Sequence, residues 1–247
     1  MPRLCLITAV APDDAHHLKN LTQSVLSQDF TDWEWMVVED GPDRKAAPYL
    51  PDDPRVSYMH TARQAGPAMC RNIGVAGVDV EWVRNIDCDD WFPEEFTLTR
   101  VLDDLDQHPE ADYGLGKVIE KKFDGSFEAI EPAIPAGILE RGIVNEWWEA
   151  HNTRHTVSAT AITIKQDTFF LHGGYGGLTS SEDTALLMPV AATSRGLLHN
   201  FATVVYQRRA GSITTQDWHR SEQDRQWRSH FVRRVVETRR DHPGFRS

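Results

Sequence analysis

The chain has 247 residues, enough for one large domain or two small ones, and its 40% hydrophobic content suffices for a buried core. A net charge of −11 argues against a nucleic-acid-binding protein, which would carry a basic surface. The three cysteines lack the spacing of a zinc or redox motif, and no apolar run reaches membrane-spanning length. We therefore expect a soluble cytoplasmic protein with no nucleic-acid partner and no integral membrane segment.

The first half of the chain alternates predicted strands with predicted helices. Apolar runs predict strands at 4–10, 35–38, 56–59 and 82–86. Helices are expected between them, one with an apolar stripe that ends at Leu26 and one that begins at Gly66 and Pro67 and continues to residue 75. This order is typical of an α/β protein whose parallel sheet is covered by helices on both faces.

The second half is less regular. Asp124 and Gly125 lie between predicted strands at 113–123 and 127–130, and this pair is a strong hairpin signal. The later elements are expected in this order: a strand at 157–164, a glycine-rich loop at 173–177, a helix at 182–192, a strand at 201–206 and a helical tail from 218 onwards. We expect a domain over 1–212, with a nucleotide-binding half of about 1–110 and an acceptor half of about 111–212, followed by the tail over 213–247.

An acidic turn after the fourth strand is the most informative feature of the chain. Residues 87–90 read Asp-Cys-Asp-Asp, and Pro93 suits the first turn of a following helix, whose amphipathic part spans 96–105. Open α/β sheets bind ligands at the carboxyl ends of their strands. Two carboxylates one residue apart can hold one hard cation, which in turn neutralises a diphosphate. The alternative is a turn that only caps the next helix.

Three further residues stand where chemistry is expected. Asp40 ends the second strand and would contact a nucleoside or serve as a turn residue. We expect it to face the same cleft as Asp89, because both would end neighbouring parallel strands. Arg71 lies one turn into a helix, either near a phosphate site or on ordinary helix surface. Asp183 fits a general base, and it also fits a capping box with Ser180 as N-cap.

Taken in order, these motifs resemble those of the family 2 inverting glycosyltransferases, which have the GT-A fold. The resemblance covers roughly residues 3–212 and rests on five segments: Val25-Leu26-Ser27-Gln28 with Phe30 and Trp33-Glu34, Val38-Glu39-Asp40-Gly41, Gly66-Pro67-Ala68 with Arg71-Asn72-Ile73-Gly74, Asp87-Cys88-Asp89-Asp90, and Ser181-Glu182-Asp183. It implies a Rossmann-like, mostly parallel sheet with helices on both faces, a small antiparallel element and a C-terminal helix.

The resemblance also implies a reaction. One hexosyl or N-acetylhexosaminyl group would pass from a nucleotide-sugar donor, most often UDP-linked, to an acceptor nucleophile with inversion. Asp89 would hold Mn²⁺ or Mg²⁺, and Asp183 would be the general base. The donor-binding residues would be Thr8, Ala9, Val10, Asp40, Gly66, Arg71, Asp87 and Cys88. The acceptor could be a saccharide, a lipid-linked molecule, a peptide or a small natural product.

Some positions depart from the family pattern. Residues 8–10 lack the aromatic side chain that would stack on the base, and Arg209 stands where many relatives have a histidine. Arg209 would then bind the diphosphate by charge, or His219 would replace that histidine. Candidate acceptor contacts are Glu182 and two indoles, Trp147 and Trp148, which could equally fill a core.

Two other functions stay open. A sugar nucleotidyltransferase has a similar sheet and acidic site, but it should carry a glycine-rich basic loop, which residues 8–20 lack. A degenerate GT-A module would bind a nucleotide sugar without turnover. Donor hydrolysis with and without manganese separates these functions from the glycosyltransferase.

Overall fold

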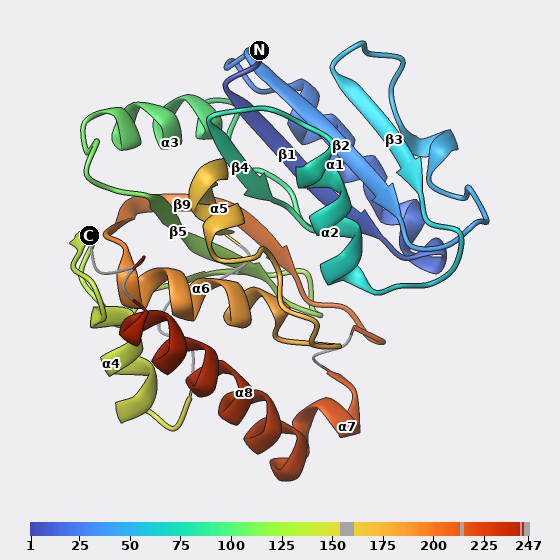
Figure 1. The fold of residues 1–247 in the computed structure, drawn as a ribbon. Coiled ribbons are helices and arrows are strands. Elements are labelled where there is room, and N and C mark those ends of the chain that lie inside the picture. The colour runs from blue at the N-terminus through green and yellow to red at the C-terminus, as the bar shows by residue number, and fades with distance from the viewer. Residues whose placement is uncertain (154–160, 213–214, 243, 245–247) are drawn as a thin grey trace.

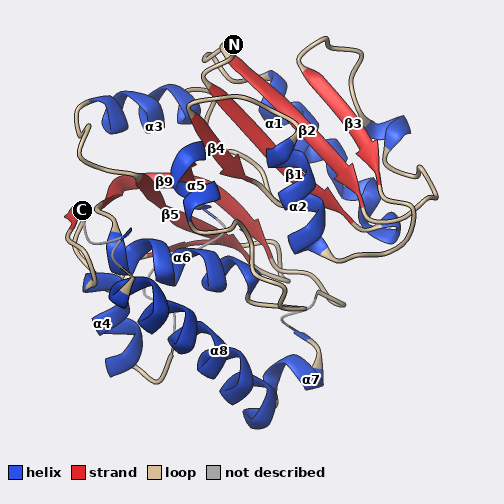
Figure 2. Cartoon of the chain, in the orientation of Figure 1, coloured by secondary structure: helices blue, strands red, loops and turns tan. Residues whose placement is uncertain are grey.

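The computed structural model describes residues 1–153, 161–212, 215–242 and 244 (Figures 1 and 2). The strands are β1 (Leu4–Val10), β2 (Trp33–Glu39), β3 (Val56–His60), β4 (Trp82–Asn85), β5 (Tyr113–Lys121), β6 (Phe127–Ile130), β7 (Gly137–Leu139), β8 (Thr163–Lys165) and β9 (Gly196–Gln207). The α-helices are α1 (Leu18–Leu26), α2 (Pro67–Ala76), α3 (Thr97–Asp106), α4 (Ile143–Ala150), α5 (Gln166–Leu171), α6 (Glu182–Thr193), α7 (Asp217–Arg220) and α8 (Glu222–Asp241). Two short 3₁₀ helices, η1 (Pro12–His17) and η2 (Ala47–Tyr49), complete the order.

These strands form a single sheet in the order β3-β2-β1-β4-β8-β5-β9-β7, with β6 beside β5. The pairs β1–β2, β2–β3, β1–β4 and β5–β9 are parallel, whereas β8, β7 and β6 pair antiparallel. The predicted α/β class and the hairpin at Asp124 and Gly125 are therefore confirmed. The sheet passes without a break from the first half of the chain to the second. Residues 157–160 of the strand expected at 157–164 lie outside the described residues, and its last two residues belong to β8.

The central strand β1 is buried on both faces, as expected of a parallel strand between two layers of helices. Leu4 and Leu6 pack in one core with residues of α1 and α3, whereas Cys5 and Ile7 pack in a second core with residues of α2 and α6. The alternation follows from the two-residue period of a strand. β1 is thus packed on both faces, and its carboxyl end is held in place at one end of the strands.

The helix after the acidic turn begins later than the sequence predicts. Pro93 was expected in its first turn, but α3 begins at Thr97. The Gln28 side chain explains this start: its amide donates to the Glu94 carbonyl at 2.8 Å and its oxygen accepts from the Leu98 N–H at 3.0 Å. Gln28, in the loop after α1, satisfies a helix N–H that would otherwise be orphaned, and no pattern local to α3 shows that.

The strands that end before Asp40 and before the acidic turn are not neighbours. We expected β2 and β4 to be adjacent, but β1 lies between them and pairs in parallel with both. The first strand of the chain is central, so the order along the chain is not the order in the sheet. Because all three strands are parallel, their carboxyl ends lie on the same side of the sheet, and so do the residues that follow them.

A buried arginine joins the parallel half of the sheet to the antiparallel half. Arg84 in β4 is 1% exposed and donates to the Ala161 carbonyl at 3.2 Å, the Thr163 hydroxyl at 2.8 Å and the Thr203 carbonyl at 2.9 Å. A buried charge needs such partners to offset its lost hydration. Arg84 thereby holds β4, β8 and β9 in a fixed relation beneath the candidate site.

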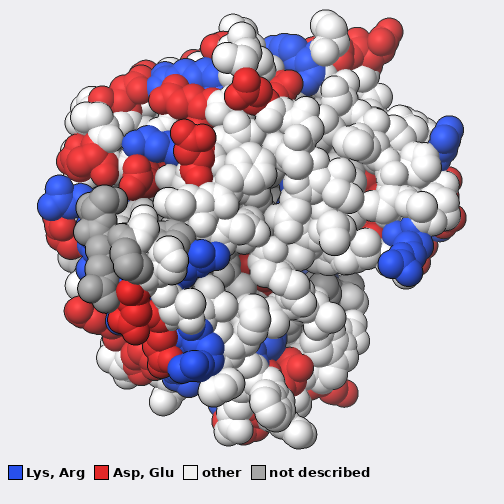
Figure 3. Space-filling model, in the orientation of Figure 1, with Lys and Arg blue, Asp and Glu red and all other residues white. Residues whose placement is uncertain are grey.

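The helical tail is packed against the sheet domain. Figure 1 shows α8 running along α6, and Val232 and Val236 of α8 belong to the same buried core as α6. Arg233 of α8 also pairs with Glu149 of α4 at 2.8 Å, and Figure 3 shows acidic and basic side chains side by side in the region of these helices. None of the described helices combines the length and apolar character needed to cross a bilayer.

Candidate active site

The acidic turn is closed by its own backbone and anchored to the last strand. The Asp90 N–H donates to the Asp87 carbonyl at 3.0 Å, and Trp91 bridges to Val205 of β9. The Asp90 side chain is 1% exposed and accepts from the Gln207 N–H at 3.0 Å. Burial raises the pKa of Asp90 well above its usual range, and the nearby Asp87 charge adds to the rise. Asp90 therefore fixes the turn, and Asp87 and Asp89 remain closer to solvent.

Arg209 binds the second carboxylate of the turn. Its guanidinium donates to Asp89 and, at 2.8 Å, to Asp14 of η1. Burial and the Asp87 charge raise the pKa of Asp89, while Arg209 opposes that rise. His17 lies in the same surroundings, because its charge interacts with those of Arg209, Asp89 and Asp14. The turn, η1 and the end of β9 thus converge on Asp89.

The side chains around Asp89 suit one hard cation that takes a single ligand from the protein. In the part of the chain that the structure describes, no three His, Cys, Asp or Glu side chains converge as a metal-binding group. The Asp89 carboxylate is a ligand of the type that Mg²⁺ and Mn²⁺ take, and Mg²⁺ commonly binds one or two carboxylates together with substrate phosphates and water. A cation at Asp89 fits if the diphosphate supplies the other oxygens and Arg209 moves aside.

A buried ion-pair chain connects the acidic turn to the start of α6. Arg71 of α2 is 6% exposed and donates to Asp87 at 2.7 Å and to Glu182 at 2.5 Å. Asn85 donates to the same Asp87 oxygen at 3.2 Å, and Arg71 lies 5.2 Å from the ring centroid of Tyr175. Burial raises the pKa of Glu182, while the charge of Arg71 opposes the rise. Arg71 is therefore committed to two carboxylates.

Asp183 stands at the second position of α6, directly after Glu182, the last member of these ion pairs. It is half-buried, and its carboxylate accepts from the Thr184 N–H at 2.6 Å. The predicted capping box is wrong, because Ser181 is the N-cap, its φ is 62°, and its side chain makes no capping hydrogen bond. Ser180 and Ser181 instead accept from Arg228 of α8, at 2.8 and 2.7 Å. A left-handed non-glycine residue costs about 1–3 kcal/mol, and Arg228 offsets that cost.

The predicted donor residues gather where β1 and β2 end and α2 begins. Asp40 accepts from the N–H groups of Ala65 and Gly66, at 2.6 and 3.0 Å, and so ties the end of β2 to the start of α2. Thr8 is fully buried and donates to the Ile86 carbonyl at 2.9 Å, which links β1 to the acidic turn. Val10 and Cys88 are also buried, and Ala9 is partly exposed.

The predicted acceptor residues are less uniform. Trp148 is 3% exposed and packs in the core, whereas Trp147 is partly exposed and stacks on His151 at 3.8 Å. His219 of α7 lies 2.9 Å from the Ser180 hydroxyl, and its electrostatic neighbours include Arg228 and Asp183. His219 is thus placed beside α6, and Arg209 alone of the two residues contacts Asp89.

Comparison with known proteins decides the family. The sequence pattern of "Glycosyl transferase family 2" matches residues 11–176, which is more than half of the chain. The chain belongs to this family. A "Putative colanic acid biosynthesis glycosyl transferase WcaA" of Escherichia coli (strain K12) is 31% identical over 81 residues, which are 31% of this chain and 29% of that protein.

Solved structures resemble this family 2 chain in fold. TarS 1–349 of S. aureus in complex with UDP-GlcNAc matches with a TM-score of 0.72 at 16% identity, over 96% of this chain and 66% of that one. The mannosyltransferase PcManGT of Pyrobaculum calidifontis, in complex with GDP-Man and Mn²⁺, matches with a TM-score of 0.62 at 12% identity, over 96% and 73% of the two chains. The chain spans less than two thirds of the relative and of the TarS chains. The GT-A fold is confirmed.

Several residues of the candidate site were missed in the sequence. Asp14 of η1 shares Arg209 with Asp89, His17 of η1 lies within electrostatic range of all three, and Arg228 of α8 holds the residues before Asp183. The acidic Pro-Asp-Asp segment after β1 is the only signal that could have indicated Asp14, and it reads as an ordinary helix start. Arg228 lies in an arginine-rich tail that is more simply explained as a solvated helix face.

Proposed function

We propose that this chain is a metal-dependent inverting glycosyltransferase that adds one sugar from a nucleotide-sugar donor to an acceptor nucleophile. The observation that carries the proposal is the Asp87–Arg71–Glu182 chain of ion pairs. These ion pairs link the acidic turn, where we propose that the diphosphate binds, to the first turn of α6, which holds the proposed base Asp183. Inversion requires the acceptor to reach the anomeric carbon from the side opposite the leaving group.

The proposed step is one displacement. The acceptor oxygen attacks the anomeric carbon as the bond to the donor diphosphate breaks, and Asp183 takes the acceptor proton as the new bond forms. Asp183 lies in the first turn of α6, directly after Glu182. A cation bound to Asp89 would stabilise the charge on the departing diphosphate. Arg209 and Asp14 would then reposition around Asp89.

The donor is proposed to be UDP-linked. Support comes from the fold, which matches TarS with UDP-GlcNAc at a TM-score of 0.72 and with UDP at 0.67, against 0.62 for PcManGT with GDP-Man, so a guanosine nucleotide is the alternative. A thermal-shift panel of UDP-, GDP- and dTDP-sugars tests the choice, because a ligand that binds only the folded state raises apparent stability. We expect the largest shift with a UDP-sugar and Mn²⁺.

Turnover is tested by donor hydrolysis. A glycosyltransferase should release nucleoside diphosphate slowly from its donor in water when Mn²⁺ is present. A degenerate module would bind the same donor and release nothing, and a nucleotidyltransferase would produce pyrophosphate from a sugar phosphate and a nucleoside triphosphate. The product therefore identifies the reaction class.

A reducing compartment such as the cytoplasm is the proposed location. Cys5, Cys70 and Cys88 are all free and buried, and burial raises the pKa of each thiol. Such thiols behave as small apolar core residues. They need no oxidising environment.

Asp89→Asn should weaken Mn²⁺-dependent UDP binding about tenfold or more, because hard cations prefer charged oxygen ligands and a charge-assisted contact is lost. Calorimetric titration of UDP with Mn²⁺, and separately with a chelator, measures the change. Asp112→Asn is a matched control, since Asp112 is also paired with a cation, Lys165 at 3.1 Å, but precedes β5 at the other end of the sheet.

The same titrations distinguish the metal from Arg209. Unchanged UDP affinity in Asp89→Asn with Mn²⁺ present would refute the metal assignment. UDP binding that persists in the chelator and is lost in Arg209→Gln would show that the guanidinium neutralises the diphosphate without a cation.

A further inference from the structure

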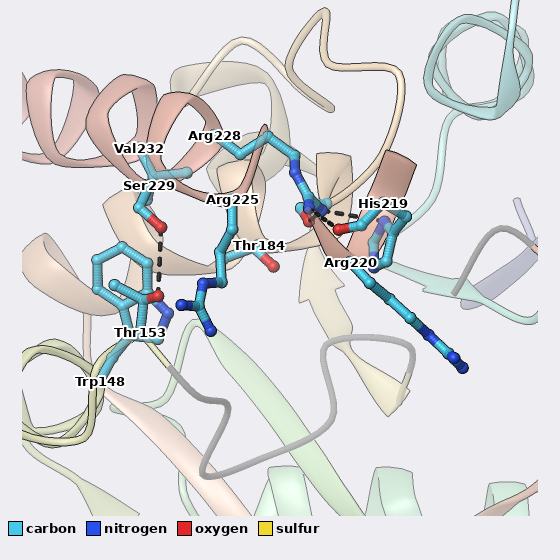
Figure 4. Close-up of a pocket in the computed structure, with 10 residues that line it drawn as sticks. Trp148, Thr153, Thr184, His219, Arg220, Arg225, Arg228, Ser229 and Val232 are labelled. Atoms are coloured by element: carbon cyan, nitrogen blue, oxygen red, sulfur yellow. Dashed lines mark hydrogen bonds between the residues drawn. The ribbon is translucent and has the colours of Figure 1, made fainter. Parts of the chain in front are cut away.

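A pocket of about 370 Å³ lies between the tail helices and the start of α6. It is lined from α8 by Arg225 and Arg228, from α7 by His219 and Arg220, and from α4 by Trp148. Figure 4 shows Arg225 extending from α8 into the space beside Trp148 and Thr153. Its volume falls in the range of pockets that hold small molecules.

The pocket is basic although the protein is acidic. Three arginines and a histidine line it, and none of the described lining residues is an aspartate or glutamate, against a net charge of −11 for the chain. Arg228 is fixed by its bonds to Ser180 and Ser181, and it pairs with Asp224 of α8 at 2.8 Å, so a ligand anion would meet Arg220 and Arg225 instead. Such a site attracts anions and repels cations.

Arg225 is the cation best placed to exchange its partner for a ligand. It pairs with Glu222, three residues before it on the same helix, and the two side chains are 51% and 63% exposed. Exposed pairs of this type contribute little to stability, so a ligand anion can replace Glu222 at small cost. A guanidinium also presents two parallel N–H donors, which match the oxygens of a phosphate.

A second donor in the pocket wall has no partner among the described residues. Trp148 is 3% exposed, and its indole N–H makes no hydrogen bond to any residue that the structure describes. That N–H is itself closed off from solvent, so a ligand in the pocket would meet the indole ring on this wall and take its polar contacts from the guanidinium groups on the other.

The pocket lies beside the helix turn that holds the proposed base. Ser181 and Thr184, which flank Glu182 and Asp183 in the sequence, both line it. A molecule bound there lies directly beside the first turn of α6, on the side of the tail helices.

We propose that this pocket binds a phosphate group of the acceptor. The acceptor then carries a phosphate group in this pocket and presents its hydroxyl toward the first turn of α6. The volume exceeds that of a phosphate alone and accommodates the unit that carries it. The acceptor role rests on the proposed function, whereas phosphate binding by the pocket does not.

Calorimetry with inorganic phosphate, and with glycerol phosphate against glycerol, tests the pocket at constant ionic strength. Wild type should bind both phosphates and not glycerol. Arg225→Gln should weaken phosphate binding about tenfold, the effect of losing one charge-assisted hydrogen bond. Arg234→Gln is the matched control: Arg234 also lies on α8, pairs three residues away with Glu237 and is 68% exposed, but does not line the pocket.

The outcomes separate this proposal from the glycosyltransferase assignment. Absence of phosphate binding, equal weakening in both variants, or competition by UDP would overturn the pocket assignment. Phosphate binding that depends on Arg225 in a protein that binds no nucleotide sugar would leave the pocket intact and refute the proposed function. Neither side chain is buried, so both variants should keep the wild-type melting temperature. That measurement checks that the variants are folded.

Discussion

Asp183→Asn should lower the single-turnover rate of donor cleavage about 10²–10⁴-fold, the range for removing a positioned base. Asparagine keeps the shape and can still accept from the Thr184 N–H, as the carboxylate does at 2.6 Å. What it loses is the capacity to take a proton. The fold and the affinity for UDP should therefore change little. The rate is measured on purified protein with a nucleotide-sugar donor and Mn²⁺.

Asp167→Asn is the control for the helix contribution of Asp183. Asp167 occupies the second position of α5, just as Asp183 does in α6, and it is exposed. Each substitution removes a negative charge from a first helical turn, which costs about 0.3–1 kcal/mol. Only Asp183→Asn should also lower the rate. A near-wild-type rate per folded molecule would rule out Asp183 as the base and leave it a helix-stabilising residue.

Arg71→Met should cause the largest loss of stability, about 3–5 kcal/mol, because it removes the charge that compensates two carboxylates. Asp87 and Glu182 would then face each other without their common partner, and the Glu182 side chain is only 10% exposed. Methionine fills a similar space, so lost packing is a minor part of the effect. Denaturant unfolding followed by circular dichroism measures it.

A second substitution tests the origin of that loss. Glu182→Gln in the Arg71→Met background should recover part of the stability, since it neutralises one of the two stranded carboxylates. Arg234→Met removes an exposed pair on α8 and should cost no more than about 1 kcal/mol. A loss below about 1 kcal/mol in Arg71→Met would contradict the buried ion-pair chain.

Local sequence patterns predicted the helices and strands and the residues at the carboxyl ends of the strands, because these features depend on residues close in sequence. The β1 range was predicted to the residue, and the acidic turn follows β4 as expected. Side-chain partners depend instead on topology. Arg209 meets Asp14 across 195 positions and Arg71 meets Glu182 across 111, and no spacing rule connects them.

Two of the errors have the same origin. Gln28 sets the start of α3 from the loop after α1, so Pro93 could not mark it. Arg228 engages Ser180 and Ser181, so the expected capping box does not form. In both cases a distant polar side chain outcompetes a local preference, because it satisfies a group that would otherwise be buried without a partner.

The tail helices give the protein a natural point for diversification. Arg225 and Arg228 belong to α8, while the predicted donor residues precede residue 90, so the two sets of contacts lie on segments far apart in the sequence. Recombination that exchanges about the last thirty residues would alter the wall of the pocket beside α6. It would leave the predicted donor residues at the carboxyl ends of the strands unchanged. Chimaeras joined between Arg209 and the start of α7 at Asp217 should therefore retain nucleotide preference and acquire a new acceptor.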